Sequence, residues 1–146
     1  MHQFQQIHQA MGDKAFTQQV VNAAPYFGSI DPILTKLESG CAEVLLKNQK
    51  KIHNHIGTVH AIAMCNAAEL AAGMATTVSI PENSRWIAKG MTVVYLVKAK
   101  TDLRVVTEAT EVDFSIEGDV IVPVAAYDEK DVKVFTAQIT MNVKHN

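Results

Sequence analysis

A single carboxylate lies in the middle of a long apolar stretch. Between Val59 and Ala75 the only formally charged side chain is that of Glu69. A carboxylate in such surroundings can act as a general base or as a nucleophile. It can also be a buried structural residue that is hydrogen-bonded to Asn66 or to a backbone N–H. The chemistry of this chain therefore centres on Glu69.

Polar residues precede this stretch and form a second candidate group. Asn54 and His60 stand where the chain enters the apolar segment; alone, Asn54 is typical of a turn and His60 of a helix start. His53, His55 and His60 suggest a metal site. No Cys or carboxylate stands at ligand spacing beside them, however, and histidine is ordinary in a polar loop. We expect neither a metal nor a cofactor.

Helical and strand patterns alternate along the chain. Apolar residues at helical spacing predict a helix over residues 2–22, interrupted at Gly12, and Pro25 and Gly28 mark the loop that follows. Two short strands with a turn at Ser39–Gly40 come next, and then a polar loop.

The apolar segment predicts a helix of about four turns, with Thr58 as its N-cap and Gly73 as its stop. In the last β-rich segment apolar and polar residues alternate, which is typical of a strand with one buried and one wet face. Four segments after the helix are β-rich, at residues 85–100, 103–116, 119–127 and 132–144.

The central helix is apolar nearly all round, so it must be covered on most sides. The segment Ile56–Ile80 is long enough to cross a membrane, but His60, Asn66, Glu69 and many small residues argue against that interpretation. A strongly curved antiparallel sheet wrapped around the helix would cover it. We therefore predict a single α+β domain over residues 1–146, with an additional N-terminal helix.

Composition and charge exclude several classes of protein. The chain is 48% hydrophobic and 19% charged, as ordinary globular proteins are. Its net charge of −2 gives no excess of positive charge that would attract nucleic acid or an anionic membrane. Cys41 and Cys65 form neither a disulfide framework nor a metal motif. The first 20 residues lack the apolar core of a signal peptide. We expect a cytoplasmic protein with no nucleic-acid or membrane partner.

The chain resembles the hotdog-fold acyl-CoA thioesterases. In the phenylacetate-degradation type, the segment entering the central helix reads Asn-x-x-Gly-Thr-x-His-Gly-Gly, with an acidic residue nine positions after the His. Here Asn54, Gly57, Thr58 and His60 match, and Glu69 stands at the acidic position. The runs "APYFGSIDP", "NHIGTVHAIA" and "RWIAKGM" resemble more closely a bacterial hotdog family of unknown function.

The resemblance implies catalytic roles for side chains and for the main chain. Glu69 would be the base or nucleophile, and the N–H of Ala61, at the positive end of the helix dipole, would stabilise the oxyanion. Ala61 and Ile62 replace the two glycines of the motif, but a main-chain donor does not require Gly. Asn54 would hold the thioester oxygen or the water. His60 would fix the loop or the carboxylate of a second chain.

The resemblance also implies an acyl thioester substrate, carried by coenzyme A or another carrier. Gly57 and Thr58 would line its site. Basic residues in two groups would meet the phosphates of coenzyme A, namely Arg85 with Lys89, and Lys47 with Lys50 and Lys51. Three aromatic residues would line an acyl pocket, namely Tyr26, Phe27 and Trp86. For each basic residue the alternative is a solvated surface, and for each aromatic residue it is the core.

The eight-residue spacing of Ala61 and Glu69 bears on the oligomeric state. We expect the two residues on nearly opposite faces of the helix, where one thioester carbonyl cannot meet both. Two helices packed side by side across a two-fold axis would bring Glu69 of one chain to Asn54, His60 and Ala61 of the other. The resemblance thus implies a homodimer, or a dimer of dimers, with sites at the interface.

Two other functions stay open. In hotdog dehydratases a His precedes the helix Glu by fourteen positions, as His55 precedes Glu69 here, but the proline- and glycine-rich run of those enzymes is absent. A non-catalytic module that binds acyl-CoA in the same groove is the third alternative, because the second glycine of the motif is missing.

Overall fold

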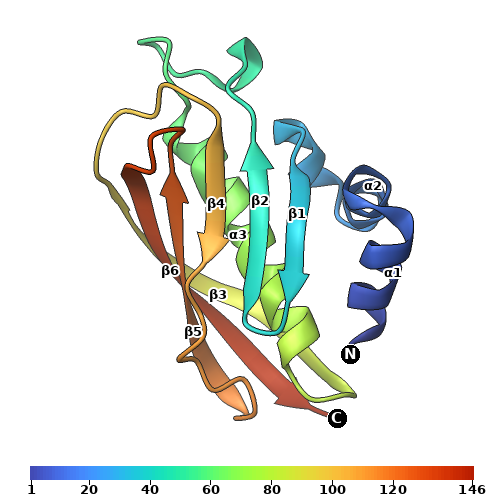
Figure 1. The fold of residues 1–146 in the computed structure, drawn as a ribbon. Helices are drawn as coiled ribbons and strands as arrows, with labels where there is room; N and C mark the ends of the chain where they lie inside the picture. Colours follow the sequence, from blue (N-terminus) through green and yellow to red (C-terminus); the bar gives the residue numbers. More distant parts are fainter.

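The computed structural model describes residues 1–146 and consists of one antiparallel sheet with helices on one side of it and beside one edge (Figure 1). The helices are α1 (Gln3–Met11), α2 (Asp13–Ala23) and α3 (Ala61–Ser79), with short 3₁₀ helices at η1 (Pro25–Ile30) and η2 (Lys50–Ile52). The strands are β1 (Ile33–Glu38), β2 (Cys41–Leu46), β3 (Ser84–Tyr95), β4 (Leu103–Thr107), β5 (Gly118–Tyr127) and β6 (Lys133–His145).

The six strands follow the order β1-β2-β4-β5-β6-β3, and the sheet curves around α3 (Figure 1). Of the 19 residues of α3, 12 are buried, and 10 of these form one core with the inward-facing side chains of the sheet. By length and composition α3 could cross a membrane, but 67% of its most apolar window is buried inside the domain. The expected α+β hotdog arrangement is confirmed.

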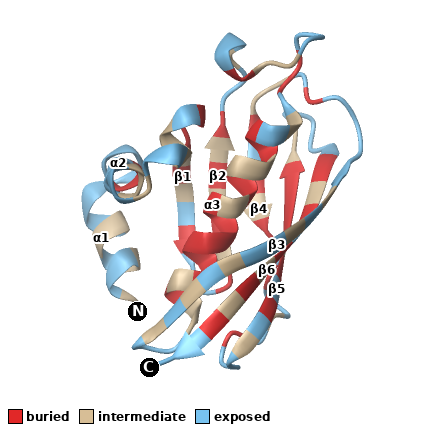
Figure 2. Ribbon diagram, turned by 180° about the vertical axis from the view of Figure 1, so that it is seen from behind, coloured by how far each residue is buried: buried red, intermediate tan, exposed pale blue.

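The interruption of the N-terminal helix at Gly12 is also confirmed. Gly12 has a φ of +86°, a conformation that favours glycine, and it separates α1 from α2. The side chains of His8 and Asp13 meet across this joint at 2.7 Å. α1 has no buried residue (Figure 2). α2 lies beside the edge strand β1, where the N–H of Leu34 donates to the buried Thr17 hydroxyl at 2.8 Å.

The prediction that Gly73 stops the central helix is wrong, because α3 continues through it to Ser79. The side chain of Trp86, from β3, lies so close that a Cβ at position 73 would be 2.8 Å from its ring. Trp86 also donates from Nε1 to the hydroxyl of Thr77, one turn further along the helix, at 2.9 Å. Position 73 therefore requires glycine because β3 approaches the helix closely there, and not because the helix ends.

Two of the predicted strands are shorter than expected. β4 ends at Thr107, and the residues up to Gly118 form turns in which Ala109 and Phe114 are buried, so their apolar character reflects an anchored loop. β3 ends at Tyr95, and the chain beyond it crosses to the loop before α3, where the N–H of Val59 donates to the carbonyl of Ala99 at 2.8 Å. The alternation predicted for the last strand is present in β6.

Candidate functional site

The start of α3 leaves one backbone donor free. His60, rather than the predicted Thr58, is the N-cap, and its Nδ1 accepts from the N–H of Ile62 at 3.0 Å. The carbonyl of His60 accepts from the N–H groups of Ala63 and Met64 at 3.0 and 3.2 Å. The N–H of Ala61 has no hydrogen-bond partner, and it stands at the positive end of the helix dipole.

Asn54 organises the turn that leads into α3. Its Oδ1 accepts from the N–H groups of Ile56 and Thr58 at 3.1 and 3.0 Å, and its Nδ2 donates to the Thr58 hydroxyl at 2.8 Å. Gly57 takes a φ of +80° in this turn. The hydroxyl of Thr58 is thus engaged and its side chain buried, and the side chain of Asn54 has a structural role of its own.

We expect Asn54→Ala to lower the free energy of unfolding by about 1–2 kcal/mol, because two backbone N–H groups and one hydroxyl lose their partner. Asn54→Asp keeps an acceptor for all three and should melt within about 2 °C of the wild type. Thermal melts of the two variants, followed by circular dichroism, test this. An Asn54→Ala protein that melts with the wild type but is catalytically impaired would contradict the structural role and favour a chemical one.

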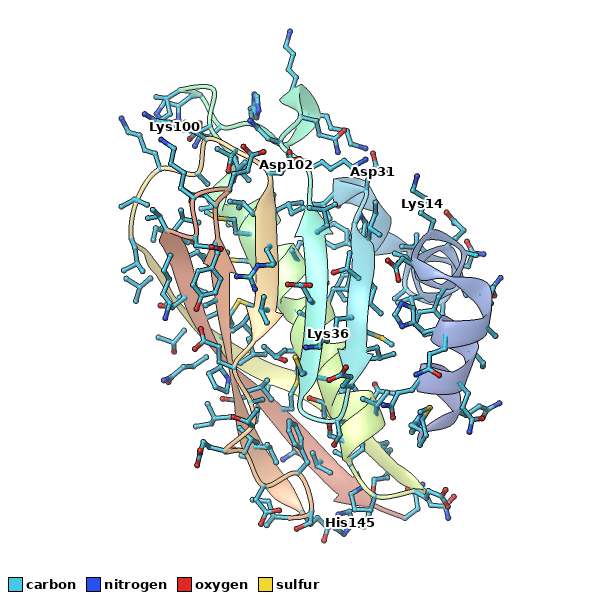
Figure 3. All side chains as sticks on the ribbon, viewed as in Figure 1. Lys14, Asp31, Lys36, Lys100, Asp102 and His145 are labelled. Carbon is cyan, nitrogen blue, oxygen red and sulfur yellow. The ribbon has the colours of Figure 1, made fainter.

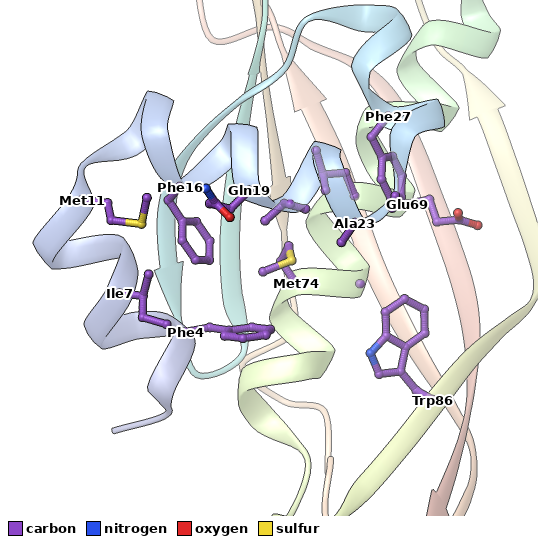
Figure 4. A pocket seen from close by; sticks show the side chains of 14 residues that line it. Phe4, Ile7, Met11, Phe16, Gln19, Ala23, Phe27, Glu69, Met74 and Trp86 are labelled. Carbon is purple, nitrogen blue, oxygen red and sulfur yellow. The ribbon is translucent and has the colours of Figure 1, made fainter.

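Glu69 has a free carboxylate at the edge of an apolar pocket. It forms no hydrogen bond or ion pair within the chain. The bond to Asn66 that a purely structural Glu69 would make is absent, and Asn66 Nδ2 donates instead to the Ser29 hydroxyl at 3.2 Å. Figure 4 shows the Glu69 stem beside the Phe27 ring and the carboxylate pointing away from the apolar side chains. The pocket, which α1 and α2 cover, has a volume of about 460 Å³. Phe27 and Trp86 line it, as predicted for an acyl pocket, and Tyr26 does not.

The partly exposed residues of α3 form a single stripe. They include Ala61, Ile62, Cys65, Asn66 and Glu69, and Ile62 is 56% exposed. The expectation that Ala61 and Glu69 lie on nearly opposite faces is therefore wrong. Eight residues turn a helix by two full turns and only about 80° more, but they advance it by about 12 Å. Distance along the axis separates the two residues, and they line different hollows of the chain.

His60 and Ala61 face two further hollows. Ala61 lines one of about 390 Å³ with Asn54 and Lys98. His60 lines another of about 430 Å³ with Lys51 and Tyr26. In a single chain the proposed carboxylate, oxyanion donor and histidine thus belong to three separate surfaces.

Cys65 lies on the same stripe but is a poor nucleophile. Its Sγ is 4.0 Å from the hydroxyl of Tyr95 on β3. Burial raises the pKa of the Cys65 thiol, so it stays protonated at neutral pH. The only unengaged reactive group of the stripe is therefore the carboxylate of Glu69.

Arg85 and Lys89 lie far from the start of α3 in the same chain. Both are exposed at the far end of β3, where Arg85 bonds the side chain of Asn146 and Lys89 contacts Asp119 at 3.0 Å. Hydrogen bonds from Asn142 and Lys89 lower the pKa of Asp119. Within one chain these two cations are matched to local partners instead of facing the candidate site.

A different group of cations surrounds the start of α3. Lys98 lines the hollow of Ala61, and the loop that carries Lys47 is tied to this end by the Asn48 side chain, which donates to the carbonyl of Lys100 at 3.1 Å. Figure 3 shows Lys100 at one end of the molecule and His145 at the other. Lys47, Lys98 and Lys100 form no ion pair. The sequence pattern did not identify Lys98, because only the contact between Val59 and Ala99 places it there.

His53, His55 and His60 do not converge on one point. His53 contacts the Asn48 side chain at 2.6 Å, His55 is exposed, and His60 caps α3. No group of three or more His, Cys, Asp or Glu side chains is placed to hold a metal ion.

Solved structures share this fold. A crystal structure described as "genomics APC5556" is 48% identical to the chain, covers 99% of it and 97% of its own length, and has a TM-score of 0.90. The thioesterase HI1161 from Haemophilus influenzae is 9% identical, with 82% of each chain covered and a TM-score of 0.73. The protein smu.793 from Streptococcus mutans UA159, solved bound to acetyl-CoA, is 16% identical, with 77% of this chain and 88% of that chain covered and a TM-score of 0.67.

No curated protein matches the chain. Residues 12–143 match the family described as "Domain of unknown function (DUF4442)". The resemblance to a bacterial hotdog family of unknown function is thereby confirmed, and the chain belongs to the DUF4442 family.

Proposed function

We propose that the protein is a thioesterase that hydrolyses acyl thioesters of coenzyme A. One observation carries the proposal: α3 presents an unpaired backbone N–H at Ala61 and an unbonded carboxylate at Glu69 on one partly exposed stripe. These are the two groups that thioester hydrolysis requires, an oxyanion donor and a base or nucleophile. The fold shared with the Haemophilus influenzae thioesterase and with the acetyl-CoA-bound Streptococcus mutans protein supports this choice of reaction and substrate.

The proposed site is completed by a second copy of the chain. Figure 2 shows α3 from the side opposite β2 and β4, where no further layer covers its middle. The neighbouring end of β3 and the two residues after it expose apolar side chains that a partner would bury: Val94, Tyr95, Leu96 and Val97. Two antiparallel α3 helices, facing each other through their stripes, would bring Glu69 of one chain to Ala61 of the other. Within one chain Ala61 and Glu69 are about 12 Å apart along the helix axis. In the antiparallel pair, Glu69 of one chain lies beside Ala61 of the other, so this separation no longer keeps the two groups apart.

The reaction proceeds at the thioester carbonyl. Glu69 takes a proton from water, and the hydroxide formed attacks the carbonyl carbon. The carbonyl oxygen becomes an oxyanion that the N–H of Ala61 stabilises. When the C–S bond breaks, the thiolate of coenzyme A takes the proton back from Glu69, and a carboxylic acid and a free thiol are the products. Lys98, which lines the hollow of Ala61 and forms no ion pair, would meet the phosphates of the carrier.

We expect the protein to release free thiol from a panel of acyl-CoAs, measured with a thiol-reactive dye, at rates well above the spontaneous rate. Small unactivated esters should react more slowly, because they lack the phosphates. The same panel separates the alternatives. Hydration of enoyl-CoAs would identify a dehydratase. Tight binding of every acyl-CoA without thiol release would identify a non-catalytic binding module and would overturn the proposal.

A further inference from the structure

The pocket between the N-terminal helices and α3 is largely apolar. Of its 14 lining residues 11 are hydrophobic, the single charged one is Glu69, and α2 adds the polar side chain of Gln19. In Figure 4, Glu69 stands at one end of the group, and Ile7 and Met11 of α1 stand at the opposite end. A molecule that fills this pocket therefore needs a long apolar part, with its polar part at Glu69.

The lining shows that the pocket depends on α1 and α2. The apolar side of α1 faces it through Phe4, Ile7 and Met11, although no residue of α1 is buried. Protein interiors are normally close-packed, with few voids larger than a water molecule. A helix that turns its apolar side toward an unfilled space is consistent with a wall for a ligand rather than with a core element.

The volume of the pocket sets the size of its occupant. A dry cavity of about 150 Å³, lined by apolar residues, admits one benzene ring. The pocket here, at about 460 Å³, has about three times that volume. It therefore has room for an alkyl chain of well over about six carbons, whereas an acetyl group would leave most of it empty.

We infer that this pocket takes the acyl chain of the substrate and that the protein acts on medium-chain or longer acyl thioesters. The inference rests on the proposed function, because the thioester carbonyl must lie beside Glu69 when the acyl chain occupies the pocket. Met74 lines the middle of the pocket and Trp86 the side nearer Glu69, and the acyl chain would pack against both. Each methylene that enters should contribute about 0.8 kcal/mol, or about fourfold in affinity, until the pocket is full.

Binding is measured with the full-length protein and two non-hydrolysable thioethers, S-ethyl-CoA and S-decyl-CoA. Trp86 is the single tryptophan of the chain, so its fluorescence reports directly on the pocket. We expect S-decyl-CoA to change the emission of Trp86 and to bind at least about a hundredfold more tightly than S-ethyl-CoA. We also expect kcat/KM for thiol release to rise from acetyl-CoA to decanoyl-CoA.

Two variants test where the acyl chain binds. Ala23→Phe adds a ring at a position that lines the pocket, at the end of α2, and should lower the preference for the decyl over the ethyl ligand by about tenfold. Ala15→Phe makes the same change at an exposed position of α2 outside the pocket and should keep the wild-type preference. Both variants retain Trp86 as the only tryptophan, and melting temperatures show whether each is folded.

The outcomes separate this inference from the proposed function. Equal thiol release at every chain length, with no response of Trp86, would overturn the acyl pocket and leave the thioesterase intact. Chain-dependent binding without thiol release from any acyl-CoA would overturn the thioesterase and support the pocket. Trp86 emission that changes only with protein concentration would show that a second copy of the chain fills the space, which also overturns the inference.

Discussion

Glu69→Gln should lower the turnover of acyl-CoA by about a hundredfold or more, the scale of a lost general base. The amide keeps the size of the side chain but can neither take a proton from water nor attack a carbonyl. The loss is expected whether the carboxylate acts as base or as nucleophile. Thiol release under saturating substrate measures it. Since Glu69 forms no hydrogen bond or ion pair within the chain, the melting temperature should change little.

Glu82→Gln is the matched control, because Glu82 is exposed in the loop before β3 and lies outside the candidate site. It should keep the wild-type turnover. If Glu69 were only a structural residue, the pattern would be the reverse: Glu69→Gln would change the melting temperature clearly and leave thiol release near normal. A Glu69→Gln protein with full hydrolysis would end the catalytic assignment.

Ala61→Pro should lower kcat by about a hundredfold to a thousandfold, the effect of removing one oxyanion-hole donor. Ala61 is the first residue of α3, where proline fits the helix and removes only the N–H. His60, before it, has a ψ of 137°, an extended conformation that a following proline allows. The fold should therefore be retained. Ala61→Gly keeps the N–H and should keep most of the activity. An active Ala61→Pro protein would exclude this donor.

Mixing the two inactive proteins tests whether the site is shared between chains. In a heterodimer of Glu69→Gln and Ala61→Pro, one interface site combines the intact carboxylate of one chain with the intact N–H of the other. Equal mixing after dissociation should then restore about a quarter of the wild-type activity, because half of the dimers carry one complete site of two. No recovery, although the chains have exchanged, would place both groups in a site within one chain.

Local sequence patterns were sufficient for most of the fold. The strict alternation of β6, the Gly12 joint between α1 and α2, and the turn at Ser39–Gly40 all depend on neighbouring residues, and each was predicted. The central helix was recognised because its composition requires cover on most sides. These features follow from periodicity and turn chemistry, which act within a few residues.

The N-cap at Thr58 and the opposed faces of Ala61 and Glu69 were local errors, and the other errors arose where distant segments meet. Gly73 was interpreted as a helix end, but glycine stands there because a side chain would collide with the ring of Trp86. Lys98 was overlooked because only pairing of Val59 with Ala99 places it beside Ala61. The part of α1 and α2 in forming the pocket was not predicted either, because the sequence does not say how the two helices lie against α3. Contacts of this kind depend on the tertiary arrangement and leave no local signal.

The contact between α2 and β1 has a consequence for assembly. An open sheet has two edges, and if both were free, chains could add one after another into a filament without limit. Here α2 crosses beside β1, with α1 next to it, and Thr17 accepts from the N–H of Leu34, so the N-terminal helices obstruct that edge (Figure 1). Only the β3 edge remains open. If copies of the chain pair through this free edge, growth of that kind ends at two copies, because the N-terminal helices obstruct the other edge.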